Sequence, residues 1–113
     1  MKKIFYLILV SISLAFAACS SKFDCDKANM LLNKSEMTEE EYSELIKIYE
    51  IGIDDTLKFA SEGNDNLSEK QREEIITMFA IGKRLIMDED KLTDKQVKEF
   101  ERITKKGTDG LQK

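Results

Sequence analysis

Histidine, proline and tryptophan are all absent from the 113-residue chain. Without histidine the chain lacks the commonest general base, the Ser-His-Asp and Cys-His nucleophile systems and most zinc sites. Without proline, nothing forces a break in a long helix. The sequence also contains no glycine-rich phosphate loop. We therefore expect a helical protein that is not an enzyme and holds no metal or cofactor.

Charged residues are also few at the start of the chain. After the basic residues Lys2 and Lys3, the stretch from Ile4 to Phe16 carries no charged side chain. Small residues follow at Ala17 and Ala18, which completes the layout of a secretory signal: basic start, short apolar run, small-residue cleavage site. A membrane-spanning helix needs roughly 20 apolar residues. The run is shorter, so the segment predicts a removable signal over residues 1–18 and not a permanent span.

The end of this segment, Phe16-Ala17-Ala18-Cys19, resembles the lipobox of bacterial lipoproteins, with Phe16 in place of the usual aliphatic residue. The resemblance implies diacylglycerol transfer to the Cys19 thiol, cleavage between Ala18 and Cys19, and acylation of the new amino terminus. Several acyl chains on one residue anchor a protein almost permanently, because each buried methylene contributes about 0.8 kcal/mol. The alternative is an ordinary signal cut after Ala18. Ser20 resembles the residue found in lipoproteins sorted to the outer membrane.

The chain beyond the signal is acidic. Without Lys2 and Lys3, 16 basic residues remain against 22 acidic ones, a net charge of −6. Nucleic acids and anionic membrane surfaces are bound by basic proteins, so neither is expected to bind this domain directly. After lipidation of Cys19, Cys25 is the remaining thiol, either a packed helix residue or a bond to another chain.

Helical spacing of apolar residues predicts a short helix over Asp24–Leu32 and three longer ones, over Glu39–Ser61, from Ser68 to about Met87, and from Thr93 to Gly107. Capping boxes open the three longer helices, and Gly63 is a natural C-terminal cap. The boxes are Thr38 with Glu41, Ser68 with Gln71, and Thr93 with Gln96. The predicted apolar stripes are Tyr42, Leu45, Ile46, Tyr49, Ile53, Leu57 and Ala60; Ile75, Met78, Phe79, Gly82, Leu85 and Ile86; and Val97, Phe100 and Ile103.

These elements predict an all-α fold, a small antiparallel bundle of three main helices and a short N-terminal one, since the connecting loops are short. The predicted organisation is a signal at 1–18, a lipidated cysteine and tether at 19–23, a bundle at 24–107 and a flexible tail at 108–113.

Three glycines fall at the same place in three ungapped sixteen-residue stretches that begin at Met37, Leu67 and Leu92. Either a helix-loop unit was duplicated, or well-capped amphipathic helices simply look alike. Gly52 and Gly82 lie inside predicted helices, where glycine costs roughly 1 kcal/mol relative to alanine. We therefore expect the two helices to pack closely at Gly52 and Gly82, or to kink there.

The acidic clusters do not predict a reactive site. Asp88, Asp90 and Glu99 are spaced as in an EF-hand loop, but Leu92 and Thr93 occupy a ligand position and the required glycine position. Carboxylate pairs such as Asp54-Asp55 and Glu73-Glu74 are expected on solvated helix faces.

Surplus hydrophobic residues give the best indication of function. Ile51, Phe59, Ile76 and Ile81 lie off the predicted stripes, and a small bundle cannot bury all of them. They either pack beneath other helices or form an interaction surface for an envelope protein. The expected function is a non-enzymatic interaction or inhibitory module anchored in the cell envelope, on the outer membrane. The alternatives are a carrier of an apolar ligand or lipid, and a self-assembling structural lipoprotein that forms a homo-oligomer.

Overall fold

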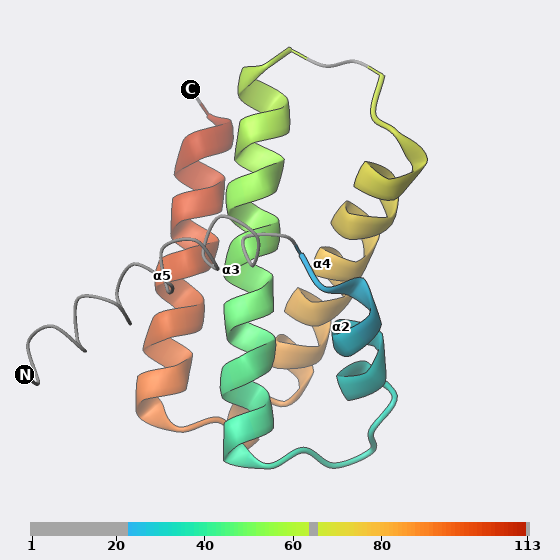
Figure 1. Ribbon diagram of the computed structural model, residues 1–113. Coiled ribbons are helices and arrows are strands. Elements are labelled where there is room, and N and C mark those ends of the chain that lie inside the picture. Colours follow the sequence, from blue (N-terminus) through green and yellow to red (C-terminus); the bar gives the residue numbers. More distant parts are fainter. Residues whose placement is uncertain (1–22, 64–65, 113) are drawn as a thin grey trace, which may run out of the picture.

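The computed structural model describes residues 23–63 and 66–112, which form an all-α bundle and contain no strand. The elements are α2 (Cys25–Leu32), α3 (Glu39–Ser61), α4 (Glu69–Met87), the short 3-10 turn η1 (Glu89–Lys91) and α5 (Asp94–Leu111). Consecutive α-helices run in opposite directions, so α3 and α5 are parallel to each other (Figure 1). The prediction of a small helical bundle is confirmed.

Helix α3 is the central element. It packs against α5 on one side and α4 on the other, and α2 lies against α4 and α3 (Figure 1). The buried core draws on α2, α3, α4 and α5, and predicted positions of α3 such as Tyr42, Leu45 and Ile53 belong to it. Fully burying a large aliphatic side chain contributes about 1.5–3 kcal/mol. The other hydrophobic residues of the core are Ala28, Leu31, Ile46, Ile48, Tyr49, Met78, Ile81, Leu85, Leu92 and Ile103.

The three capping boxes are present as predicted. In each, the hydroxyl of the first residue accepts from a backbone amide three residues later, and the side chain of that later residue accepts from the first residue's own amide. Each cap satisfies donors that a helix leaves open at its N-terminus. At the other end of α3, Gly63 adopts a φ of 64°, the left-handed conformation expected of a glycine after a helix. The three capping-box pairs are Thr38–Glu41, Ser68–Gln71 and Thr93–Gln96.

The predicted close approach at Gly52 and Gly82 is confirmed. A Cβ atom at Gly52 would lie 2.8 Å from Cγ of Met78 and 2.9 Å from the ring of Phe23. One at Gly82 would lie 3.3 Å from the ring of Tyr49. The two glycines therefore place α3 and α4 in direct contact, and each helix continues through its glycine without interruption.

The predicted helix end at Gly107 is wrong, because α5 continues to Leu111 and includes most of the stretch predicted as a tail. A Cβ at Gly107 would lie 3.1 Å from the side chain of Ile53, and one at Gly110 would lie 2.5 Å from Leu57. Both glycines thus lie where α5 meets α3. Packing of this helix face offsets the low helix propensity of glycine.

Candidate interaction surface

The four residues predicted to form an interaction surface lie in different environments. Ile76 is exposed, with 68% of its surface accessible, whereas Ile51 and Phe59 are half-buried. The prediction that Ile81 lies on the surface is wrong, because its side chain is completely buried in the core. The four residues do not form one surface.

The core-facing side of helix α4 agrees with the prediction in part. Phe79 and Ile86, predicted to be buried, are 65% and 63% exposed, whereas Ile81, predicted to lie off the stripe, is fully buried. Of the other predicted stripe residues, Met78, Gly82 and Leu85 are buried as predicted. Apolar residues cover more than one face of this helix, so its spacing alone fits two orientations. Packing against α2 and α3 selects the face that carries Thr77, Ile81 and Leu85.

One side of α4 therefore carries an exposed apolar stripe, made of Ile76, Phe79, Ile86 and Met87. Each of these side chains is 63–68% exposed. Single exposed hydrophobic residues are ordinary, but four on one helix form a patch of the kind that marks an interaction site. We call these four residues the α4 stripe.

Beside the stripe, an open groove of about 340 Å³ runs between α4 and α5. The ring of Tyr49 lies beneath Gly82 and is 5.3 Å from the ring of Phe100. The Tyr49 hydroxyl is hydrogen-bonded to the Thr104 hydroxyl at 3.0 Å, which fixes the ring between the helices. The groove residues are Tyr49, Phe79, Gly82, Lys83, Ile86, Met87, Phe100 and Thr104.

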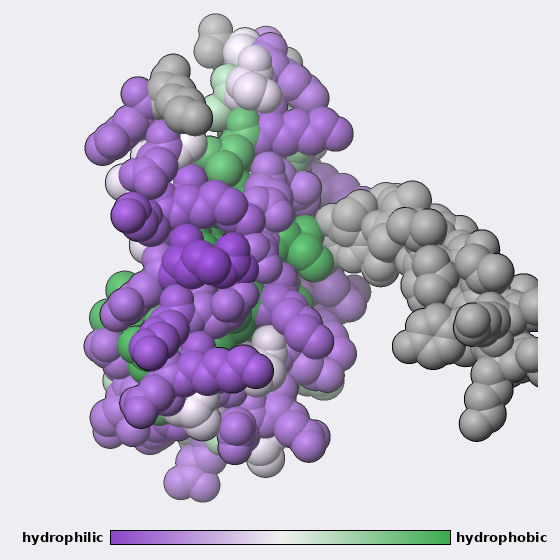
Figure 2. Space-filling view, turned by 90° about the vertical axis from the view of Figure 1, so that its left-hand side faces the viewer, coloured by the Kyte–Doolittle hydropathy of each residue, from purple (hydrophilic) through white to green (hydrophobic). Residues whose placement is uncertain are grey.

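The neighbouring surface has a different character. Hydrophilic side chains cover most of the α5 side of the molecule, and hydrophobic ones appear between them and at its left-hand edge (Figure 2). A second hollow, of about 430 Å³, lies between the first halves of α3 and α5 and is lined by charges of both signs, among them Lys47 and Glu99. The groove between α4 and α5 is thus the more apolar of the two.

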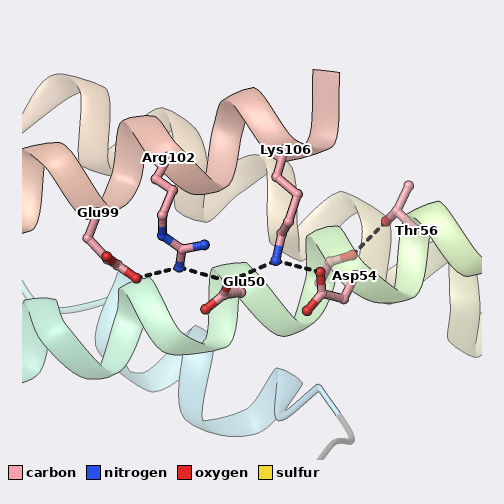
Figure 3. Close-up of polar contacts among 7 residues, drawn as sticks. Glu50, Asp54, Thr56, Glu99, Arg102 and Lys106 are labelled. Atoms are coloured by element: carbon pink, nitrogen blue, oxygen red, sulfur yellow. Dashed lines mark hydrogen bonds and ion pairs between the residues drawn. The ribbon is translucent and has the colours of Figure 1, made fainter. Parts of the chain in front are cut away.

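A ladder of ion pairs joins α3 to α5 (Figure 3). Arg102 contacts Glu50 at 2.9 Å and also pairs with Glu99, while Lys106 contacts Glu50 and Asp54 at 2.8 Å each. The hydrogen bond from Lys106, followed by that from Arg102, lowers the pKa of Glu50. Exposed pairs contribute little individually, so the ladder mainly fixes the register of the two parallel helices.

A buried polar cluster lies at the C-terminal end of α4. The Arg84 guanidinium contacts Asp88 at 2.6 Å and donates to the backbone carbonyls of Leu32, Lys34 and Ser35 at 3.1, 2.8 and 3.2 Å. Burial alone would raise the pKa of Asp88, but hydrogen bonds from Arg84 and the Tyr42 hydroxyl outweigh it and lower the pKa. The cluster binds the connection between α2 and α3 to α4, which is a structural role.

Gln96 also has a role that its capping position did not reveal. Its side-chain amide donates to the Glu39 carbonyl and the Ser43 hydroxyl, both at 2.9 Å, while its oxygen accepts from the Thr93 amide. This buried side chain therefore joins the start of α5 to the start of α3. Only the three-dimensional fold brings these partners together.

Two carboxyl groups meet across α3 and α4 in a third hollow, of about 330 Å³, which Phe59 and Cys25 also line. Partial burial and a hydrogen bond shared with Asp55 raise the pKa of Glu74 to about 8. The pKa of the Cys25 thiol is raised, first by burial and also by the nearby Glu74. The sequence predicted solvated pairs of neighbours, and the structure instead pairs one member from each.

The residues 23–63 and 66–112 hold no group of three or more potential metal ligands. Among the helices that the structure describes, none combines the length and apolar character needed to cross a membrane. The predicted lipid attachment and cleavage residues, Ala18 and Cys19, lie outside the described residues. No protein-family model, curated protein or solved structure matches the chain.

Proposed function

We propose that this chain is a lipoprotein of the cell envelope, anchored through Cys19, whose helical head binds another protein through the α4 stripe and performs no catalysis. The observation that supports binding is the stripe itself, four large apolar side chains about two-thirds exposed on one helix. The support for anchoring is the signal-like sequence ending in Phe16-Ala17-Ala18-Cys19. The resemblance of Ser20 to the residue found in sorted lipoproteins supports the outer membrane as the proposed location.

The alternative of an apolar-ligand carrier has less support. It requires space between the two long helices α3 and α4, but Met78 packs against Gly52 and Tyr49 against Gly82. The apolar surface lies outside this contact, where a protein can reach it. Self-association through the stripe remains the alternative with a structural basis.

Two measurements test the proposal separately. Replacement of Cys19→Ser should move the protein from the membrane fraction to the soluble fraction, and unchanged fractionation would refute the lipid anchor. A photo-crosslinking amino acid at position 79 should give a discrete adduct with another protein in intact cells. The same amino acid at Lys47, an exposed position on α3, is the control. Equal adducts at both positions, or none at position 79, would refute binding through α4.

A further inference from the structure

The α4 stripe and the groove beside it, which Phe79, Ile86 and Met87 line and Ile76 does not, together have the length and spacing of a helix-binding site. The α4 stripe spans eleven residue steps from Ile76 to Met87, about 16 Å or three helical turns at 1.5 Å per residue. Between Phe79 and Ile86, Gly82 has no side chain and the Tyr49 ring lies beneath it. The lining thus offers a hollow between two apolar projections, the arrangement that accepts side chains one and two turns apart on a partner helix.

The charge of the groove indicates what such a helix carries. Lys83 is the one charged residue among those lining the groove. Within residues 23–63 and 66–112, no carboxylate lies within ion-pair distance of Lys83, in contrast to Arg84 and Lys106. A carboxylate on the occupant would complement this cation beside an otherwise apolar lining.

We propose that the groove binds a partner-protein amphipathic helix of about three turns, whose apolar side chains pack around Gly82 and whose Asp or Glu pairs with Lys83. The inference deepens the proposed function and rests on it. The four stripe side chains would bury on the order of 1,000 Å² in total over both surfaces, the size of a transient interface.

A second copy of the chain fits the groove less well. Symmetric packing of two α4 stripes would place the two-fold axis near the middle of the stripe, next to residues 81 and 82. Lys83 from each copy would then lie near the same axis in an apolar interface. Like charges brought together in this way destabilise a complex.

An unbiased peptide selection tests the chemistry of the occupant. A display library of random 16-residue peptides is selected against the full chain as the cell produces it, held in lipid nanodiscs. Peptides that also bind the exposed-site variant Phe79→Asp are removed. We expect enriched sequences with apolar residues at i, i+3 or i+4 and i+7, and with one Asp or Glu. No enrichment, or enrichment of extended or basic sequences, would overturn the inference.

A charge reversal makes the test specific for Lys83. The variant Lys83→Glu should bind the acidic peptides about tenfold more weakly and select Lys- or Arg-containing helices in their place. Its helical content by circular dichroism should match that of the unmodified chain, because Lys83 is exposed. Unchanged binding by this variant would overturn the pairing.

Other occupants give distinct results. Phe79-dependent self-association, seen by sedimentation of the unmodified chain, would overturn the inference in favour of a second copy. Phe79-dependent binding to vesicles of neutral or anionic lipid would overturn it in favour of a membrane surface. Crosslinking from position 79 in cells, combined with peptides that lack helical spacing, would preserve the proposed function and refute the helix. If the selection enriches helical peptides but position 79 gives no crosslink in cells, the inference about the groove would stand and the proposed function would be refuted.

Discussion

The Tyr42 hydroxyl donates a buried hydrogen bond of 2.8 Å to the carboxylate of Asp88, 46 residues further along the chain. The same carboxylate oxygen accepts from Arg84, whose guanidinium holds three carbonyls of the α2–α3 connection. One side chain at the end of α4 therefore connects the first turns of α3 with the segment that precedes it.

Removal of the Asp88 side chain should destabilise the fold, because the partly buried Arg84 charge and the buried Tyr42 hydroxyl both lose their shared partner. We expect Asp88→Ala to lower the free energy of unfolding by about 3 kcal/mol, and Tyr42→Phe by about 1 kcal/mol. Urea unfolding of the soluble chain that begins at Ser20 measures both. The exposed neighbour Asp90 is the control, and Asp90→Ala should change stability by less than about 0.5 kcal/mol. Equal effects at Asp88 and Asp90 would contradict the role of the cluster.

The paired carboxyls of Asp55 and Glu74 predict a dependence on pH. Folding raises the Glu74 pKa from 4.5 to about 8, so between these values the folded state binds more protons than the unfolded state. The stability contribution is therefore fully present below pH 4.5 and is lost as the pH rises through 8. Urea unfolding should show stability falling between pH 5 and pH 8.5.

The variant Glu74→Gln should remove most of this slope and unfold at higher urea concentration than the original chain at pH 8.5. Because the site is partly solvated, we expect a gain of about 1 kcal/mol at that pH. Glu73→Gln, on the exposed neighbour, provides the matched control and should leave the slope intact. A slope that persists in Glu74→Gln would assign the pH dependence to other groups.

Close contact between α3 and α4 predicts different effects when alanine replaces each of two glycines. Gly52→Ala should destabilise the bundle by about 1–3 kcal/mol, since the new Cβ would lie 2.8 Å from Met78. Gly82→Ala should be nearly neutral, because a small shift of the Tyr49 ring relieves a contact of 3.3 Å and alanine favours the helix by about 1 kcal/mol. Thermal unfolding followed by circular dichroism compares them. A larger loss at Gly82 than at Gly52 would contradict these contacts.

Local signals in the sequence were sufficient to predict where the helices begin. Each capping box depends on residues three positions apart, and each forms as predicted. The end of α5 was not predictable in this way, because Gly107 stops a helix unless a neighbour packs against it, and that neighbour, Ile53, comes from α3.

The candidate interaction surface was harder to predict than the helix starts, because it depends on packing between segments far apart in the sequence. Apolar spacing correctly marked α4 as having surplus hydrophobic surface, and Ile76 as part of it, but assigned Ile81 to the wrong side. The orientation of α4 is decided by α2 and α3, whose positions no local pattern contains. The Asp55–Glu74 pair and the partners of Gln96 arise in the same way, from segments brought together by the fold.

The two sides of α4 should respond differently to the same substitution. Ile81→Ala removes a fully buried side chain and should lower the free energy of unfolding by about 2–5 kcal/mol. Phe79→Ala removes a larger side chain that is 65% exposed, so its effect should remain below about 1 kcal/mol. Crosslinking to a partner from a photo-reactive group at Met87 should nevertheless be lost in Phe79→Ala and retained in Glu73→Ala, an exposed neighbour outside the stripe. Strong destabilisation by Phe79→Ala would contradict the orientation of α4, because a side chain that stabilises the core is not available to a partner.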